Sequence, residues 1–303
     1  MLKTAAGLAP MFSQVVSAQQ LANLLLEIAP EENKPAIVQQ KPCRFEYTAY
    51  SKTVAVAFSM ESGQAGARLT LLAAAGKSTT LCALVDYINR HRKDHIITIE
   101  DPIEFVHQKK NCLINQREVH VHTKSFSQAL RAALREDPDI VLVGEMRDLE
   151  TISIAIETAE TGHLVFGTLH TTTAASTVDR IIDQFPADRQ PQIRTMLSTS
   201  LKGVISQTLC KKIGGGRIAA MEALFVTSAV SNLIREGKIY QIPSIMQTGK
   251  KQGMTVLNDV LFKQVVDKQV APEEAYIKSV DKAGFVALLK TKSIVLDLKE
   301  IEE

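Results

Sequence analysis

The chain has 303 residues, of which 45% are apolar and 22% are charged, and its net charge is +2 at neutral pH. This composition is typical of a globular protein that buries a substantial core without disulfides, and it excludes a disordered chain. Balanced charge, 5% aromatic residues and no tryptophan argue against a nucleic-acid motor, and because no apolar run reaches the roughly 18 residues of a membrane span, a cytoplasmic protein is expected.

The N-terminal part of the chain differs from the rest in its pattern of apolar and polar residues. Residues 1–66 are predicted to form a small domain and its linker, with strands favoured where β-branched and aromatic residues gather in "RFEYTAY" and "TVAVAFSM". The Gly/Ala/Ser-rich "ESGQAGAR" marks the boundary. Residues 67–303 are then a second domain.

The second domain begins with alternating strands and helices. Helices are expected from about Lys77, from a cap at Ser125, and between Leu149 and Gly162. The apolar stretches between them are LTLL, HIITIE, DIVLVGE and HLVFGTLH. Apolar strands separated by helices predict a mostly parallel sheet covered on both faces. Beyond Thr171 the pattern is mainly helical, with one further strand in "GGGRIAAMEALFVT".

The stretch "LTLLAAAGKSTTL" ends as a phosphate-binding loop ends, in Gly76-Lys77-Ser78 followed by Thr79. In such a loop glycines let backbone N–H groups surround a phosphate, lysine neutralises charge, and Ser or Thr binds Mg²⁺. The motif should open with glycine five positions before Gly76, where this chain has Leu71. Alone, the three residues fit equally well a helix N-terminus with an exposed lysine.

Carboxylates follow two of the predicted strands. Glu145 ends "DIVLVGE", as a Walker B acid does, and Glu100, Asp101 and Glu104 follow "HIITI". Carboxyl ends of parallel strands meet at one edge of a sheet, where ligands bind. So many carboxylates repel each other unless a cation lies among them, which indicates Mg²⁺.

Two histidines bracket a strand in "GHLVFGTLH", His163 and His170. One histidine alone is usually structural, but two at the ends of a strand beside acid-tipped strands favour sensing of a γ-phosphate or a subunit contact. Zinc is not expected, because the histidines lack helical spacing and cysteine companions.

Six sequence motifs follow one another along the second domain: TIEDPIEF, NQREV, ALREDPDIVLVGEMRDLET, AETGHLVFGTLHTT, ISQTL and SNLIREGK. In this order they resemble the type IV pilus retraction ATPase (PilT) family of the secretion ATPase superfamily. The similarity runs without gaps from Gly76 to about Lys292, and "AVSNLIRE" resembles the family's C-terminal signature.

The resemblance implies an α/β fold, a RecA-like P-loop ATPase domain with a small PAS-like α/β domain before it. It implies ATP and Mg²⁺ as cofactors and a homohexameric ring in the cytoplasm, at the inner face of the membrane. It further implies an inner-membrane pilus platform protein as partner, with a related retraction ATPase as a second one and no nucleic acid.

Residue roles follow from the same resemblance. Gly76, Lys77, Ser78 and Thr79 hold the nucleotide, with Ser78 on Mg²⁺. The second Glu of the Asp box, Glu104, activates water. The other expected catalytic residues are the Walker B acid Glu145, which reaches Mg²⁺ through water, the His-box pair His163 and His170, and the cross-subunit arginine Arg180.

The chain departs from the family in one place. The family's loop reads Gly-Pro-Thr-Gly-Ser-Gly-Lys-Ser, so Leu71 and Ala74 replace two glycines. The N-terminal region is also several dozen residues shorter than the family implies, so one deletion, rearrangement or sequence error is expected to explain both. Two functions stay open: a ring motor that hydrolyses ATP to retract pili for twitching motility, and a ring subunit of the same machine without turnover.

Overall fold

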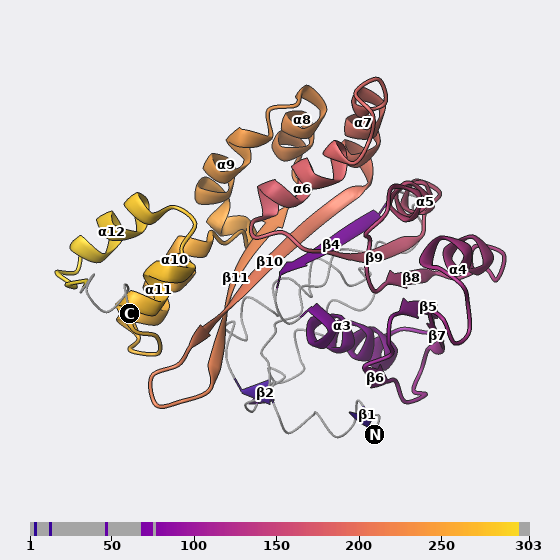
Figure 1. The fold of residues 1–303 in the computed structure, drawn as a ribbon, viewed down its shortest axis with the longest axis horizontal. Coiled ribbons are helices and arrows are strands. Elements are labelled where there is room, and N and C mark those ends of the chain that lie inside the picture. Colours follow the sequence, from indigo (N-terminus) through magenta and orange to yellow (C-terminus); the bar gives the residue numbers. More distant parts are fainter. Residues whose placement is uncertain (1–2, 5–11, 14–45, 48–67, 75–76, 297–303) are drawn as a thin grey trace.

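The structure is a computed structural model, and it describes residues 3–4, 12–13, 46–47, 68–74 and 77–296 (Figure 1). Most of the predicted N-terminal domain, 1–66, lies outside these residues, so its PAS-like fold and its boundary stay predictions. Three short strands belong to it: β1 (Lys3–Thr4), β2 (Phe12–Ser13) and β3 (Glu46–Tyr47). Strand β2 pairs with β3, and β1 pairs with β6 (Phe105–Val106).

A seven-stranded sheet organises the rest of the described chain, in the order β11-β10-β4-β9-β8-β5-β7. All neighbours are parallel except β10 and β11, so the predicted mostly parallel sheet is confirmed. The strands are β4 (Arg68–Ala74), β5 (His95–Glu100), β7 (Leu113–Glu118), β8 (Ile140–Val143), β9 (Leu164–Leu169), β10 (Leu201–Lys211) and β11 (Arg217–Phe225).

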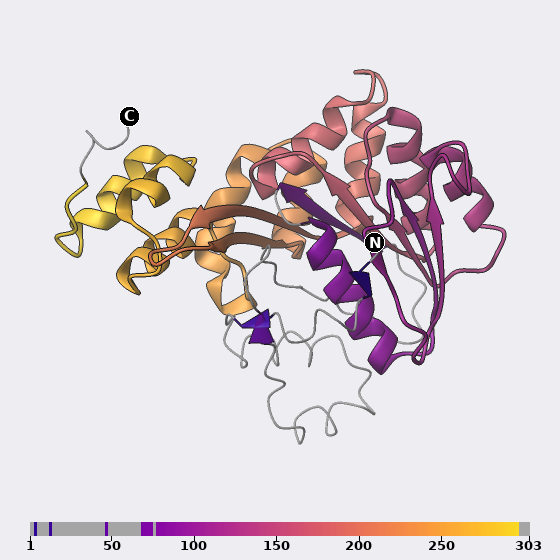
Figure 2. The same cartoon turned by 60° about the horizontal axis from the view of Figure 1, so that its bottom comes forward.

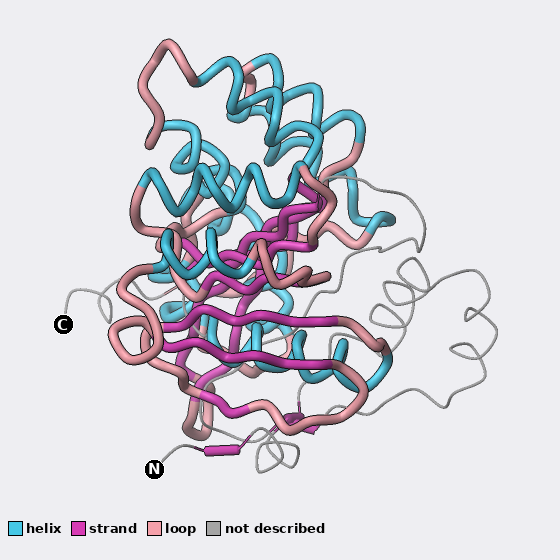
Figure 3. The backbone as a smooth tube through the Cα atoms, turned by 90° about the vertical axis from the view of Figure 1, so that its right-hand side faces the viewer, coloured by secondary structure: helices cyan, strands magenta, loops and turns pink. Residues whose placement is uncertain are grey.

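Helices cover both faces of the sheet. Helix α3 (Lys77–His91) packs on one face through Leu81, Leu84 and Val85, while four helices pack on the other (Figure 1). Those four are α4 (Phe126–Ala133), α5 (Leu149–Glu160), α6 (Ala174–Asp183) and α7 (Gln190–Ser200). Viewed from the side that carries β5 and β7, most helices lie above the strands (Figure 3).

The last three helices form a lobe beside the hairpin that joins β10 and β11 (Figure 2). They are α10 (Leu257–Val266), α11 (Pro272–Lys278) and α12 (Lys282–Lys290), and their core includes Cys210, Ile218, Leu261 and Phe285. The elements before them pack with the core under α4 to α7: α8 (Ser228–Glu236), η3 (Ile239–Gln241) and α9 (Ile242–Thr248), which η4 (Gly249–Gln252) follows. Among the described helices, none has the length and apolar character needed to cross a bilayer.

Two of the helix ends in the structure lie where the sequence predicts them. Ser125 Oγ accepts a hydrogen bond from the backbone N–H of Gln128 at 3.2 Å, which satisfies a free donor at the start of α4. Gly162 follows α5 with a φ of 102°, the left-handed region that favours glycine. Both local predictions are confirmed.

The prediction of a mainly helical chain beyond Thr171 is wrong for residues 201–211, which form β10. This strand is buried on both sides and carries apolar residues in no regular alternation, so its periodicity does not distinguish it from a helix. Its pairing with β4 and β11 decides its conformation. Strand β7 was also not predicted, and among the described strands it pairs with β5 alone.

The strand predicted for LTLL, residues 69–72, is confirmed, but the interpretation of Leu71 and Ala74 as the glycine positions of a loop is wrong. Strand β4 runs from Arg68 to Ala74, and within it Leu71 lies opposite Gly167 of β9 and Val204 of β10. The run of apolar residues favours a strand buried on both faces. Because α3 begins at Lys77, only two residues separate strand from helix.

Replacing Leu71 with glycine therefore removes a fully buried core side chain. We expect Leu71→Gly to lower the free energy of unfolding by about 3 to 5 kcal/mol, from the lost apolar burial and added backbone freedom. Urea denaturation measures this. The matched control is Leu113→Gly on the edge strand β7, where the side chain is 55% exposed. Equal losses in the two variants would contradict the placement of Leu71 in the sheet.

Candidate functional site

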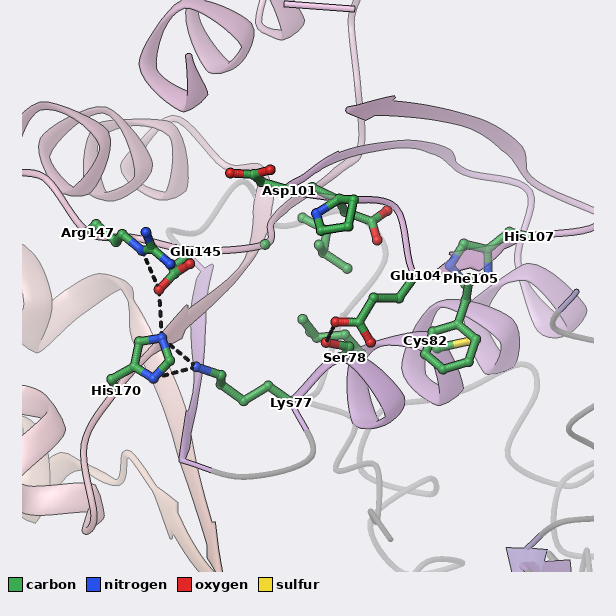
Figure 4. Close-up of a pocket in the computed structure, with 15 residues that line it drawn as sticks. Lys77, Ser78, Cys82, Asp101, Glu104, Phe105, His107, Glu145, Arg147 and His170 are labelled. Atoms are coloured by element: carbon green, nitrogen blue, oxygen red, sulfur yellow. Dashed lines mark hydrogen bonds and ion pairs between the residues drawn. The ribbon is translucent and has the colours of Figure 1, made fainter. Parts of the chain in front are cut away.

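A cavity of about 220 Å³ opens at the carboxyl edge of the sheet (Figure 4). It lies between the first turn of α3 and the loops that follow β5, β8 and β9, as expected for a ligand site in a parallel sheet. The polar side chains that line it are Lys77, Ser78, Glu100, Asp101, Glu104, His107, Glu145, Arg147 and His170.

Lys77 extends from the N-terminus of α3 toward the end of β9. Its Nζ donates to the backbone oxygen of Leu169 at 3.3 Å and lies 3.2 Å from both ring nitrogens of His170. Burial lowers the pKa of Lys77, nearby Glu145 acts in the opposite direction, and Arg147 lowers it further. A cation at a helix N-terminus, beside free backbone N–H groups, forms an anion-binding site.

Close packing at the end of β8 fixes the position of Glu145. The preceding Gly144 donates its N–H to the oxygen of Ile99 at 2.7 Å, and a Cβ on Gly144 would lie 2.9 Å from that oxygen. Thr168 of β9 adds a hydrogen bond from its hydroxyl to the oxygen of Gly144 at 2.5 Å. Only glycine permits this approach, which delivers Glu145 to the cavity.

Glu145 is the centre of a chain of charged groups (Figure 4). Its Oε1 accepts from His170 Nε2 and from Arg147 Nε, each at 2.6 Å. Burial by itself raises the pKa of Glu145, but the hydrogen bonds from Arg147 and His170 outweigh it and lower the pKa. Glu145 is therefore a carboxylate at neutral pH, connected through His170 to Lys77.

Ser78 and Glu104 form a second contact on the other side of the cavity. Ser78 Oγ donates to Glu104 Oε1 at 2.8 Å (Figure 4). The sequence assigned these side chains to the metal and to the attacking water. The fold brings them together although they are 26 residues apart.

Of the polar side chains named above, Arg147 and His107 were not identified from the sequence. Arg147 follows the Walker B acid by two positions, and that spacing alone carries no motif. His107 Nδ1 is buried without a hydrogen-bond partner in the described structure. Burial is the main cause that lowers the pKa of His107 from 6.5 to about 4, with nearby Asp86 raising it and Lys110 lowering it.

Not every residue selected from the sequence reaches the cavity. His163 precedes β9, at the opposite end from His170, and contacts Thr161 and the oxygen of Thr158. Arg180 is exposed on α6, and Thr79 is buried in α3. Among the described residues, these three do not line the cavity. Gly76 lies outside the described residues.

The side chains of the cavity fit the terminal phosphate and Mg²⁺ of a nucleotide better than the chain fits the remaining phosphates. Lys77, Ser78, Glu104 and Glu145 are the residue types that bind a terminal phosphate and its Mg²⁺. In the phosphate-loop register, residues 71–76 would surround the remaining phosphates. Residues 71–73 instead pair with both β9 and β10, and Ala74 pairs with β10, so this backbone belongs to the sheet.

A family model described as "Type II/IV secretion system protein" matches residues 37–284, which is 248 of the 303 residues. The chain belongs to that family. The type IV pilus retraction ATPase PilT of Pseudomonas aeruginosa is 62% identical over 199 residues, covering 66% of this chain and 58% of the relative. A twitching motility protein of Neisseria gonorrhoeae is 60% identical over 201 residues, covering 66% and 54%. The chain thus spans little more than half the length of these relatives.

Solved structures of the same family share the fold. A crystal structure of the pilus retraction motor PilT with bound ADP matches with a TM-score of 0.68 and 50% identity, covering 72% of this chain and 63% of that one. The ATPase DotB of Legionella pneumophila matches with a TM-score of 0.64 and 26% identity, covering 71% and 60%. The predicted RecA-like ATPase fold and the resemblance to retraction ATPases are confirmed.

His107 predicts an acid sensitivity of the fold. In the unfolded chain it gains a proton near pH 6.5, whereas in the folded chain it does so only near pH 4. The unfolded state therefore binds more protons between these values, and stability falls as the pH falls, by about 3 kcal/mol over the whole interval.

The measurement is the free energy of unfolding of the native chain minus that of His107→Asn, from pH 7 to pH 4. This difference should shrink on acidification. The control is His120→Asn, at an exposed position whose φ of 68° asparagine tolerates. A difference that is independent of pH would contradict the buried, neutral state of His107.

Proposed function

We propose that the chain is a subunit of a cytoplasmic ATPase motor that retracts type IV pili and so powers twitching motility. The observation that carries the proposal is the convergence of Lys77, Ser78, Glu104, Glu145 and His170 on one cavity. The similarity to proteins named as pilus retraction and twitching motility ATPases supports it.

Bound Mg·ATP supplies an electrophilic terminal phosphorus and a cation that offsets charge at the leaving oxygens. Lys77 would hold the phosphates by its positive charge, and the hydroxyl of Ser78 would be a ligand of the metal. Ser78 would then no longer donate to Glu104, which would leave Glu104 able to orient a water and accept its proton. Glu145, with His170 beside it, would hold water near the metal.

The proposed motor is a ring of identical subunits. We assign residues 1–66 to a PAS-like domain and 67–303 to the ATPase domain of a homohexameric ring. Arg180 is exposed and away from its own cavity, which suits a residue that reaches a neighbour's nucleotide. His163 is half-buried and also lies away from the cavity, which suits a subunit contact. The further partners are the inner-membrane platform protein of the pilus and a related retraction ATPase.

A second function is favoured by one observation, the continuation of β4 to Ala74. With residues 71–74 committed to the sheet, nucleotide contacts fall mainly to the start of α3 and the loop acids. A ring subunit that assembles with the machine but does not turn over ATP fits that reduced site.

Two substitutions separate the motor from the subunit without turnover. Glu104→Gln should abolish phosphate release and leave Mg·ATP affinity unchanged within about twofold, because the phosphate contacts remain. Lys77→Ala should weaken affinity by at least about tenfold, since a charge-assisted contact is lost. Calorimetric titration and phosphate release measure the two effects, with the exposed Glu157→Gln as control.

Saturable Mg·ATP binding by the native chain without phosphate release would select the second function. Loss of binding in Glu104→Gln would contradict the role of Glu104 as water-activating base.

Mixing two inactive variants tests Arg180. If Arg180 acts on a neighbour's nucleotide, Arg180→Ala subunits retain an intact cavity that a Lys77→Ala neighbour can complete. Phosphate release should therefore reappear when the two variants are mixed into common rings. The control pair combines Lys77→Ala with Glu104→Gln, which share no such complementation. Inactive mixed rings would place Arg180 in its own subunit's site or outside catalysis.

A further inference from the structure

Arg147 lines one side of the cavity, beside Glu145, from the loop after β8 (Figure 4). Its side chain is 74% exposed, whereas that of Glu145, to which it is bound, is 15% exposed. The contact with Glu145 places Nε of the guanidinium 2.6 Å from Oε1. A guanidinium carries five N–H donors, so Arg147 keeps further donors that can face the cavity and solvent.

One oxygen of Glu145 accepts from two side chains. His170 Nε2 and Arg147 Nε each lie 2.6 Å from Oε1. A carboxylate has two oxygens, so in the proposed motor Glu145 can order water on a metal through Oε2 while Oε1 keeps a donor. The pairing of Arg147 with Glu145 therefore competes with the phosphate oxygens that Arg147 can bind instead, and not with the metal.

The two donors have similar exposure, 74% for Arg147 and 68% for His170. His170 also lies 3.2 Å from Lys77 Nζ and directly follows a buried strand, so Arg147 is the donor that can leave with the smaller loss of contacts. Arg147 has a long, exposed side chain on a loop, and its release from Glu145 uncovers a planar cation at the mouth of the cavity. Guanidinium groups bind phosphate oxygens through two parallel hydrogen bonds.

We infer that Arg147 determines specificity for the triphosphate: it holds Glu145 when the terminal phosphate is absent and binds that phosphate when it is present. The inference rests on the proposed nucleotide site. A diphosphate lacks the terminal group, so Arg147 stays on Glu145 in the ADP state and distinguishes substrate from product.

The test compares the affinities of a non-hydrolysable ATP analogue and of ADP, both with Mg²⁺, for the native chain and for Arg147→Gln. Affinity for the analogue should fall about 10- to 100-fold, as for a lost charge-assisted hydrogen bond, and affinity for ADP should change less than about threefold. Arg147→Lys should recover part of the loss, because it keeps the charge without the planar pair of donors.

The matched control is Arg131→Gln, whose side chain is 61% exposed, pairs with Glu150 and lies outside the cavity lining. It should leave both affinities unchanged. If Arg147 merely positions Glu145, Arg147→Gln weakens both nucleotides equally or neither, and that result overturns the inference while the nucleotide site stands. A native chain that binds neither nucleotide overturns the site and the inference together.

Discussion

The pairing of β4 on both of its edges is the constraint on which the rest of the structure depends. Leu71 packs with the core under α4 to α7, and the next residue, Leu72, packs with the core under α3. Both faces of the sheet are therefore held through one strand. The same strand carries the chain to Lys77 at the carboxyl edge, so the position of the first turn of α3 follows from the sheet rather than from a flexible loop.

At that edge, the charges of the cavity are satisfied within the chain. Arg147, Glu145, His170 and Lys77 form one connected network, and Ser78 with Glu104 forms a separate pair. An arriving polyanion with its cation must replace these contacts with its own. The binding free energy is then the difference between two well-paired states, and for that reason the preference for one nucleotide can depend on a single exposed arginine.

Much of the fold and half of the site could be predicted from local sequence. Apolar runs that end in acid placed Glu145 and Glu104 at a common edge, because side-chain period and strand direction are local properties. Local sequence could not predict strand β10, the extension of β4 to Ala74 or the burial of His107 Nδ1. Each of these depends on partners that are distant in sequence. Arg147 carries no motif at all, and its contact with Glu145 appears only in three dimensions.

Amide hydrogen exchange across residues 71–74 tests the account most directly. If these backbone N–H groups belong to the sheet, those of Leu71, Leu72 and Ala73 are strongly protected in the free chain, and added Mg·ATP leaves their rates unchanged. Protection of the first turn of α3 should instead increase on binding. Fast exchange of the three amides in the free chain, with protection gained only when Mg·ATP is added, would contradict the account and show a phosphate loop that folds around its ligand.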